Sequence, residues 1–421
     1  MPQVTLRQGT YVGALKRDTH VYHGIPYAQP FSKRFEAPQP LPESDEEFSA
    51  TDLTSNCPQL PSRFAFLNGT WLPSTKYDEK DSGVLSVYAL EVSGSSDSLP
   101  VIVWVHGGAW VTGGSQLSNY DGTKLAQDAA AVVVCINYRL GALGFLYDER
   151  RSLDNGPELP AGTADVVATF EWVHANIQAF GGDSSNITAI GQSVGAHQTQ
   201  ALLAARPDLF DKAVLISSPA GFTNPPSSAA KARADSIAYL SDHTTPETAS
   251  IETLLQAQTK AMIANPGSLS TWGPTTTIAP GFLKPTSLVD SKQILIGWAA
   301  NDGRVFLHLA SPETPLSQLN NVLTDQIFCE PSIALAKQSR KQGHAVTTFE
   351  LTWAPEGFAF GPTHCIDLPL TFGFEAWSRS SMCLEKDMDE WEARGRRWRQ
   401  RIGSFARDGT PFVAENGIKV F

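Results

Sequence analysis

The sequence predicts an α/β fold with a doubly wound, mostly parallel sheet and helices on both of its faces. Three observations support this prediction: apolar runs of strand length recur along the chain, helical patterns lie between them, and apolar residues make up 42% of the 421 residues against 18% charged. Alternating strands and helices are typical of a parallel sheet covered on both sides. The length would allow two or three domains, but large α/β enzymes also reach it as one unit.

The expected strands are short apolar runs bounded by turn residues. They are Val101–Val105, Ala131–Ile136, Ile187–Ile190, Ala213–Ser217, Gln293–Gly297 and Ala345–Leu351. Near-continuous runs rich in β-branched residues fit strands that are buried on both faces, as in a parallel sheet.

Two segments show the apolar period of a helix. Between residues 163 and 180 the apolar positions recur at spacings of four, three and four, at Val166, Phe170, Val173 and Ile177. These positions share one helix face, and the glycine pair that follows, beginning at Gly181, is a typical helix end. A second apolar stripe lies near the C-terminus, at Met388, Trp391, Trp398, Ile402 and Phe405.

Residues 222–290 interrupt the alternation of strands and helices. The segment is rich in Pro, Ser, Thr and Ala, and its two helical stretches, 230–240 and 250–264, are weak. We expect a cap or lid inserted into a single catalytic domain that spans residues 1–421, rather than a second domain.

Charge and hydropathy exclude several classes of protein. The formal net charge is -11, so a basic face for nucleic acid is not expected. No apolar run approaches the roughly 18 residues of a membrane helix, and no leader segment is visible at the N-terminus. The five cysteines are sparse and include no C-x-x-C pair, which indicates neither a zinc site nor a disulfide scaffold. We therefore expect a cytoplasmic protein with reduced thiols.

The candidate nucleophile is Ser193, in the sequence Gly191-Gln-Ser-Val-Gly195 between an apolar strand and a helical stretch. In that context G-x-S-x-G is the nucleophile elbow of α/β-hydrolases. The turn is so tight that side chains two residues before and after the serine would collide, which explains both glycines. The serine is held in a strained conformation at a helix N-terminus, where the dipole favours a developing negative charge. His197 lies one helical turn further on, so we expect it to pack rather than to act as the base.

The candidate oxyanion hole follows the strongest predicted strand, in the sequence Val105-His-Gly-Gly-Ala-Trp110. Glycines allow the backbone to approach a substrate, and backbone N–H groups there stabilise the charge that develops on an ester carbonyl. We expect the donors to be the N–H groups of Gly108, Ala109 and Val194. The motifs of phosphate-binding loops are absent from the sequence.

These motifs, with further segments along most of the chain, resemble the type-B carboxylesterase (cholinesterase-like) family of α/β-hydrolases. The matching segments are Gly24–Ala28, Cys57–Gln59, Val105–Trp110, Asn137–Phe145, Trp172–Asp183, the elbow around Ser193, and Leu209–Ala213. The resemblance implies a doubly wound sheet of many strands, hydrolysis of carboxylic esters, and a triad in the chain order serine, acid, histidine. It implies no metal and no organic cofactor.

The chain departs from the family pattern at informative positions. Ser82 stands where the family has the disulfide partner of Cys57, so that disulfide cannot form, which favours a reducing compartment. Gln192 precedes the nucleophile where the family more often has glutamate. The chain is also shorter than usual for the family, and the shortening falls in the cap and between the acid and the histidine.

The candidate base is His364, in the sequence Gly361-Pro-Thr-His-Cys-Ile-Asp-Leu, which is similar to a loop of the family that follows a late strand. A catalytic histidine must reach over the elbow while a carboxylate orients its other nitrogen. His308 and His344 are the alternatives, although His344 precedes a predicted strand and should lie at the wrong end of the sheet.

The candidate acid is Asp302, at the position where the family usually has glutamate. Aspartate is one methylene shorter, so its loop must lie closer to His364 or the hydrogen bond must be long. Asp325 and Glu330 are the reserve candidates. Ser217 matches a family serine near the triad acid. We expect Ser217 and Gln192 to contact the triad side chains without touching the substrate.

The predicted function is that of a serine hydrolase that cleaves carboxylic esters through an acyl-enzyme. The first alternative is acyl transfer or cyclisation in secondary metabolism, because an alcohol or amine can open the same acyl-enzyme. A catalytically silent binding protein is the second alternative. The expected partner is a small-molecule ester, and the oligomeric state stays open. The aromatic side chains that we expect to line the substrate pocket are Trp110, Phe222, Trp272, Trp298 and Phe358.

Overall fold

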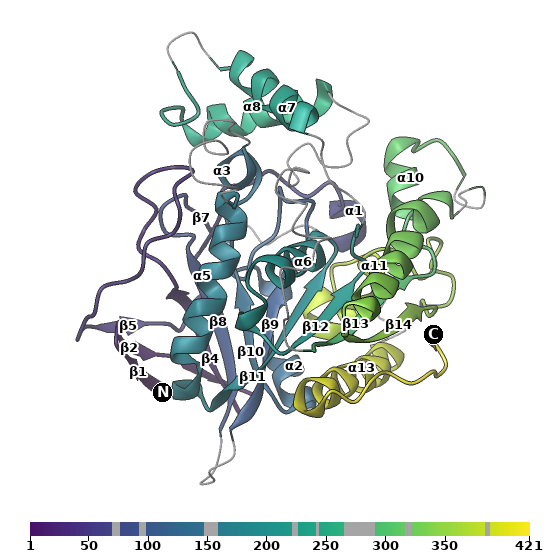
Figure 1. Ribbon diagram of the computed structural model, residues 1–421, viewed down its shortest axis with the longest axis horizontal. Helices are drawn as coiled ribbons and strands as arrows, with labels where there is room; N and C mark the ends of the chain where they lie inside the picture. Colours follow the sequence, from purple (N-terminus) through teal and green to yellow (C-terminus); the bar gives the residue numbers. More distant parts are fainter. Residues whose placement is uncertain are drawn as a thin grey trace.

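A ten-stranded sheet runs through the centre of the molecule, with helices packed on both of its faces (Figure 1). The strand order is β15-β14-β13-β12-β11-β9-β10-β8-β4-β3. The computed structural model describes residues 1–69, 76–91, 98–146, 159–220, 226–240, 244–264, 291–315, 318, 321–383 and 388–421. This architecture is the doubly wound, mostly parallel α/β fold that the sequence predicts.

The six strands predicted from apolar runs form the parallel centre of the sheet. They are β9 (Leu99–Val105), β10 (Val132–Ile136), β11 (Gly182–Gln192), β12 (Lys212–Ile216), β13 (Gln293–Ala299) and β14 (Ala345–Leu351). Neighbouring strands in this group pair in parallel. The prediction of central buried strands is therefore confirmed.

Antiparallel strands extend both edges of the parallel centre. They are β3 (Ala14–Lys16), β4 (Thr19–Pro26), β8 (Val84–Leu90) and β15 (Ile418–Val420). Two smaller sheets contain β1 (Gln3–Leu6), β2 (Gly9–Val12) and β5 (Glu47–Ser49), and β6 (Ser55–Asn56) with β7 (Lys76–Tyr77). We did not predict these strands, because most are short and several include polar residues, Gly or Pro, which break a continuous apolar run.

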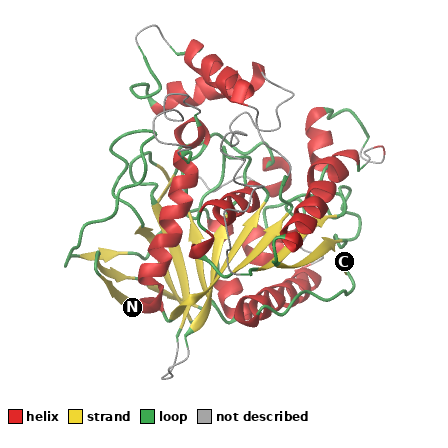
Figure 2. Ribbon diagram, viewed as in Figure 1, coloured by secondary structure: helices red, strands yellow, loops and turns green. Residues whose placement is uncertain are grey.

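The two faces of the sheet bury separate hydrophobic cores. One face packs against α5 (Ala161–Asn176), α6 (Val194–Ala205) and α11 (Glu330–Lys341), which cross in front of the strands in Figure 2. The other face packs against α2 (Thr123–Ala129), α12 (Asp367–Phe372) and α13 (Met388–Asp408). Within β9, Val101 and Val103 face the first core, and Ile102 and Trp104 face the second. This alternation follows from the two-residue period of a strand.

Both predicted helix faces are buried, with one exception. Val166, Phe170, Val173 and Ile177 are fully buried along α5 and the 3₁₀ turn η2 (Ile177–Phe180). Gly181 ends this helix with a φ of 79°. The stripe of α13 is buried from Trp391 onwards, but Met388 is 49% exposed, so the prediction for this residue is wrong. Met388 is the first residue of α13, where the exposed helix end leaves the side chain in contact with solvent.

Two helices of the expected cap, α7 (Pro226–Ala238) and α8 (Ile251–Ala264), pack together at one end of the sheet (Figure 1). In α8, Gln258 accepts a hydrogen bond from the Ala142 N–H at 2.8 Å, in the short helix α3 (Gly141–Phe145) that follows β10. Arg34 donates hydrogen bonds of 2.7 Å to the carbonyls of Pro246 and Ala249 and forms a bidentate pair with Glu79. These polar contacts tie the described part of residues 222–290 to the main body.

The remaining helical segments within the described residues are short. They are α1 (Ala65–Asn68), α10 (Arg304–Ala310), the 3₁₀ turns η1 (Ser118–Tyr120), η3 (Pro207–Leu209) and η6 (Glu375–Trp377), and the π-helical turn η5 (Thr324–Cys329). None of the described helices is both long and apolar enough to cross a membrane.

All five cysteines are free thiols. Cys57 is buried, and its sulfur accepts a hydrogen bond from the Leu140 N–H at 3.3 Å. Burial raises the pKa of this thiol to about 12. Ser82 is buried too, and its hydroxyl donates to the Glu79 carbonyl.

Candidate active site

The elbow at the end of β11 holds Ser193 in a strained conformation. Its φ of 55° and ψ of -126° lie in a region that non-glycine residues rarely adopt. The Ser193 N–H donates to the carbonyl of Ile216 on β12 at 2.8 Å, which fixes the turn against the neighbouring strand. A Cβ on Gly191 would lie 2.3 Å from the Gly195 carbonyl carbon, and a Cβ on Gly195 would lie 2.0 Å from the Val105 carbonyl oxygen. The steric reason predicted for both glycines is therefore confirmed.

The loop after β9 turns its backbone through three consecutive residues with positive φ. The φ angles are 121° at Gly108, 55° at Ala109 and 61° at Trp110. Among the described residues, the N–H groups of Gly108, Ala109 and Val194 have no hydrogen-bond partner. Val194 opens α6, directly after the serine. Three unpaired N–H donors beyond the carboxyl ends of the central strands β9 and β11 are suited to bind an oxyanion.

The glycine before this loop brings it into contact with the elbow. A Cβ on Gly107 would lie 2.6 Å from Gln192 Oε1, 2.9 Å from the Gln192 carbonyl oxygen and 3.1 Å from Ser193 Cβ. Only a residue without a Cβ permits this approach. The expected oxyanion donors and the expected nucleophile therefore lie side by side.

His106 fixes the start of the same loop. Its Nδ1 lies 2.8 Å from the Gly107 carbonyl oxygen and donates to it, because a carbonyl can only accept. The imidazole stacks on Tyr138 with ring centroids 4.4 Å apart, and the Tyr138 hydroxyl donates to the His106 carbonyl at 2.8 Å. Burial lowers the pKa of His106 to about 4, so the ring is neutral and acts as a rigid support.

His364 and Asp302 form a buried hydrogen-bonded pair. Nδ1 of His364 lies 2.6 Å from Asp302 Oδ1, and the second carboxylate oxygen accepts the Ala299 N–H at 2.9 Å. The carboxylate can only accept, so Nδ1 bears the proton and Nε2 is the basic nitrogen. Both side chains are at most 2% exposed.

The loops that bear the acid and the histidine are bonded directly to each other. The Asn301 N–H donates to the Pro362 carbonyl at 2.8 Å, and the Thr363 hydroxyl donates to the Asn301 carbonyl at 3.2 Å. This pairing brings the loops close enough for the shorter aspartate to reach His364. Of the two expected consequences of aspartate, a closer loop or a longer hydrogen bond, the structure has the closer loop.

The alternative acids and bases lie elsewhere. Asp325 and Glu330 are exposed on η5 and α11. His344 precedes β14, and its Nδ1 accepts the Lys292 N–H at 3.1 Å at the opposite end of that strand. His308 on α10 packs between Phe66 and Phe360.

The basic nitrogen of His364 faces the elbow. Gln192 Nε2 lies 3.4 Å from His364 Nε2 and 3.8 Å from Cys365 Sγ, and Gln192 is 1% exposed. Among the described residues, no hydrogen bond joins the Ser193 hydroxyl directly to His364. Catalytic hydrogen bonds often tighten only when substrate binds. Gln192 therefore contacts His364, and its supporting role stays a prediction.

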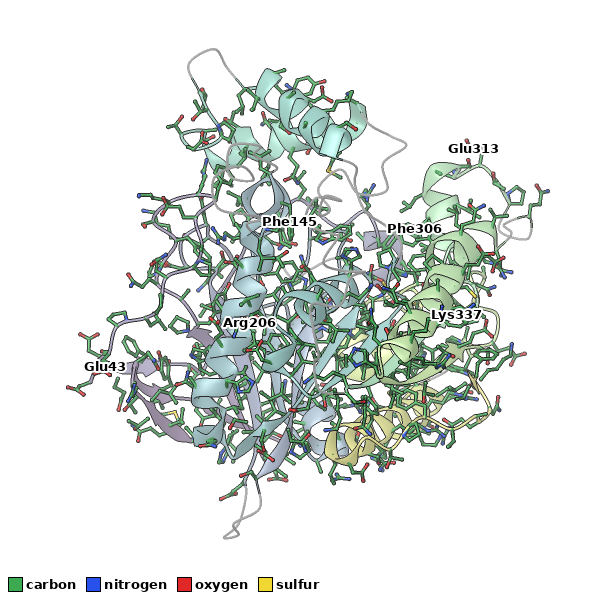
Figure 3. All side chains as sticks on the ribbon, viewed as in Figure 1. Glu43, Phe145, Arg206, Phe306, Glu313 and Lys337 are labelled. Atoms are coloured by element: carbon green, nitrogen blue, oxygen red, sulfur yellow. The ribbon has the colours of Figure 1, made fainter. Side chains whose placement is uncertain are left out.

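Three phenylalanines surround the His364 ring, and sequence reasoning did not identify them. The ring centroids of Phe306, Phe328 and Phe64 lie 5.0, 5.1 and 6.1 Å from that of His364. Figure 3 shows Phe306 at the base of α10. Phe306 belongs to the motif that contains Asp302, which could have indicated it, whereas Phe64 and Phe328 stand in no motif. These rings exclude water from the histidine and make its surroundings apolar.

A second buried carboxyl, that of Asp367, interacts electrostatically with Asp302. Asp367, at the start of α12, is 1% exposed, and its Oδ2 has no hydrogen-bond partner in the described structure. Burial and, to a lesser degree, the charge of Asp302 raise the pKa of Asp367 to about 8. Asp367 is thus mostly protonated at neutral pH, which leaves Asp302 as the charged partner of His364.

Ser217 does not support the acid as we expected. It is 1% exposed and follows β12 with a φ of 50°, but its hydroxyl has no hydrogen-bond partner among the described residues. Asp302 uses its two oxygens for His364 and the Ala299 N–H instead.

The expected pocket residues do not form one cluster. Trp110 is buried, and its ring packs edge-on against His197 with centroids 5.3 Å apart, so His197 has the packing role we expected. Trp298 on β13 stacks on Phe421, and its indole N–H donates to Glu350 Oε1 at 3.3 Å, so these contacts give it a packing role. Phe358 packs beside Phe360. Phe222 and Trp272 lie outside the described residues.

Comparisons with known proteins agree with this geometry. A model of the carboxylesterase family matches residues 1–315. The chain is 32% identical to a para-nitrobenzyl esterase of Bacillus subtilis over 416 residues, covering 88% of this chain and 82% of that one. It is 30% identical to a probable N-octanoylanthranilate hydrolase of Rhodococcus erythropolis, covering 96% and 93%. A solved para-nitrobenzyl esterase described as thermophilic superposes with a TM-score of 0.84 at 27% identity, covering 100% of this chain and 93% of that one.

Proposed function

The chain belongs to the carboxylesterase family and is a carboxylic ester hydrolase, and we propose that it works through an acyl-enzyme formed on Ser193. The observation that supports this mechanism most directly is the 2.6 Å contact between His364 Nδ1 and Asp302 Oδ1. It leaves Nε2 unprotonated and facing the elbow, which is what a general base requires.

In the first half of the reaction, Ser193 Oγ attacks the ester carbonyl while His364 Nε2 takes the hydroxyl proton. The imidazolium that forms is stabilised by the charge of Asp302. The carbonyl oxygen becomes an oxyanion and accepts hydrogen bonds from the N–H groups of Gly108, Ala109 and Val194. His364 then gives its proton to the leaving alcohol, and the acyl group stays on the serine.

In the second half, water enters where the alcohol left. His364 accepts a proton from this water, which attacks the acyl carbonyl and releases the carboxylic acid. An alcohol or amine in the same place would give acyl transfer or cyclisation instead. Added methanol tests this alternative: in a pure hydrolase the methyl ester stays a minor product, and in a transferase it dominates.

The aromatic rings around His364 support an aromatic leaving group. The leaving alcohol receives its proton from His364, and Phe64, Phe306 and Phe328 surround the same imidazole ring. Rings in edge-on or offset contact are favourable partners for a further ring. The names of two relatives, a para-nitrobenzyl esterase and an N-octanoylanthranilate hydrolase, also refer to compounds with an aromatic group. We therefore infer that aryl and benzyl esters are preferred substrates.

The test is the Ser193→Ala variant with a p-nitrophenyl ester. Loss of a triad nucleophile lowers kcat by about 10⁶-fold, so activity should fall to background. The matched control is Ser185→Ala, an exposed serine near the start of the same strand, which should keep full activity. Labelling by a fluorophosphonate should occur in the wild type and in the control and should fail in Ser193→Ala. Activity or labelling that survives in Ser193→Ala would show that the nucleophile is another residue.

A further inference from the structure

A cavity of about 300 Å³ lies outside the proposed catalytic centre. It is bounded by β3, η1, the start of α2, the end of α12 and η6, and its lining does not include Ser193, His364 or the oxyanion loop. This volume is at the lower end of the range for small-molecule sites.

The cavity wall contains a buried amide with no partner. Asn119 is 6% exposed, and neither its Nδ2 nor its Oδ1 has a hydrogen-bond partner in the described structure. Its backbone carbonyl accepts the Trp377 indole N–H at 2.9 Å, so the backbone position is fixed. Oδ1 of Asn68, which also lines the cavity, is buried without a partner among the described residues too. Buried polar groups are almost always hydrogen-bonded, so these amides indicate a ligand that supplies the missing partners.

The charges around the cavity favour a monoanion. Four cationic residues line it against two carboxylates, which gives a local charge of +2 on a chain of net charge -11. Three of the cations are ion-paired, since Lys16 contacts Asp121, Arg17 contacts Glu375 and Lys124 contacts Glu392 outside the lining. The guanidinium of Arg379 has no ion pair or hydrogen bond among the described residues. One unpaired cation matches one negative charge on the ligand.

The rest of the wall is apolar and suits an organic group. Phe372 and Trp377 are almost fully buried and border the cavity, together with the half-buried Ala376. A carboxylate can accept hydrogen bonds from the Asn119 amide and from the planar fork of Arg379, while its carbon body lies on the aromatic side chains. An inorganic anion would leave this apolar part of the wall without a partner.

Three side chains connect the cavity to His364: the Asn68 amide, the Cys365 thiol and the Gln192 amide. Asn68 Nδ2 lies 3.9 Å from Cys365 Sγ, and Cys365 Sγ lies 3.8 Å from Gln192 Nε2. Gln192 in turn lies 3.4 Å from the basic nitrogen of His364. A ligand that binds Asn68 can therefore act on Gln192 by shifting the Cys365 thiol that lies between the two amides.

We propose that this cavity binds a small organic monocarboxylate through Asn119 and Arg379, and that its occupancy slows turnover at Ser193. The ligand belongs to the same chemical class as the acid that ester hydrolysis releases, so the site would provide feedback by product. This last step rests on the proposed function, whereas the binding site itself does not.

Calorimetric titration with sodium benzoate tests the site. Benzoate should bind the Ser193→Ala protein, and it should also bind wild-type protein whose active site is blocked by a fluorophosphonate. Arg379→Ala should weaken this binding about tenfold, as expected for loss of a charge-assisted hydrogen bond. The control Arg7→Ala removes an arginine that is 84% exposed near the N-terminal sheet and should leave the affinity unchanged. In steady-state kinetics benzoate should lower kcat without raising KM, and Arg379→Ala should remove this effect.

Three results would overturn the proposal. Benzoate binding that disappears on fluorophosphonate labelling, or inhibition that is purely competitive, would place the acid in the active site. Equal affinity in the Arg379→Ala and Arg7→Ala variants would exclude the cavity. Phosphate that binds as tightly as benzoate would indicate a site for any anion. A failure of the proposed function would give a different result, namely ester hydrolysis that survives in Ser193→Ala. Benzoate binding to the unlabelled protein can be measured in either case.

Discussion

Gly107→Ala tests the proposed oxyanion loop without removing any reacting group. A Cβ at this position would lie 3.1 Å from Ser193 Cβ and 2.9 Å from the Gln192 carbonyl oxygen. Carbon atoms in contact are ordinarily about 3.5–4.0 Å apart, so the loop must move away from the elbow by roughly half an ångström or more. The φ of Gly107 is not positive, so alanine is compatible with the backbone and the effect is purely steric.

The expected loss of activity follows from the geometry of the oxyanion. Donors must lie within about 2.7–3.1 Å of the position that the oxyanion will occupy, and loss of one donor costs about 3 kcal/mol. We therefore expect kcat for a p-nitrophenyl ester to fall about 10²-fold, with little change in KM, because the oxyanion exists only in the transition state and in the tetrahedral intermediate. Overpacking should also lower the free energy of unfolding by about 1–3 kcal/mol.

A control separates lost activity from lost stability. Gly343 has a φ of 89° in a surface turn, and a Cβ added to it would meet no atom within 4 Å. Gly343→Ala should cost about 1 kcal/mol of stability through backbone strain and leave kcat unchanged. If folded Gly107→Ala protein hydrolyses the ester as fast as the wild type, the loop is not the oxyanion site and the donors lie elsewhere.

Three further predictions concern the acid, the buried carboxyl and the cap. Asp302→Asn should lower kcat about 10³- to 10⁴-fold, because the amide cannot stabilise imidazolium or hold the productive tautomer of His364; steady-state kinetics measure this. Asp367→Asn should flatten the pH dependence of stability. With its pKa raised to about 8, Asp367 keeps its proton in the folded wild type and loses it on unfolding. Between about pH 4 and pH 8 the free energy of unfolding of the wild type should therefore fall as pH rises, by up to about 1.4 kcal/mol per pH unit, and urea titrations measure this slope. Arg34→Ala should cost about 2 kcal/mol, because it leaves Glu79 and two cap carbonyls unpaired, and Arg34→Lys should restore only part of this.

Each of these predictions has a contradicting outcome. Full activity in Asp302→Asn would mean that another carboxylate orients His364. An unchanged pH slope in Asp367→Asn would mean that Asp367 is ionised in the folded protein. If Arg34→Ala unfolds at the same midpoint urea concentration as the wild type, other contacts hold the cap.

Local sequence was sufficient for the parts of the molecule that depend on local sterics. The central strands are continuous apolar runs because both of their faces are buried, and such runs are visible in any single sequence. The elbow was predictable for the same reason, since Gly191 and Gly195 are required by contacts within a few residues of Ser193 and with the neighbouring strand. Chain order and a motif resemblance were then enough to select His364 and Asp302 among many candidates.

The surroundings of the triad depend on contacts between distant segments, which leave no local pattern. Phe64, Phe306 and Phe328 come from three separate parts of the chain, and only the packing of α10 and η5 near α1 brings them to His364. Trp298 and Ser217 show the converse, because each stands at a suitable strand end and yet does not take the role we expected. The pKa of Asp367 likewise arises from burial and from a charge 65 positions away in the sequence.

The sequence alone was enough to predict the fold class, and it also led to the proposed nucleophile and to the proposed chain order of the triad, because backbone sterics and strand burial constrain neighbouring residues. The tertiary structure alone decided how a shorter acid reaches its histidine, through the hydrogen bonds between the Asn301 and Thr363 loops. It alone also produced the cavity outside the proposed catalytic centre, whose lining includes both the unpaired Asn119 amide and Arg379, more than 250 residues apart in the chain. Hydrogen bonds and charges act through space, and a sequence records only the residues available to make them.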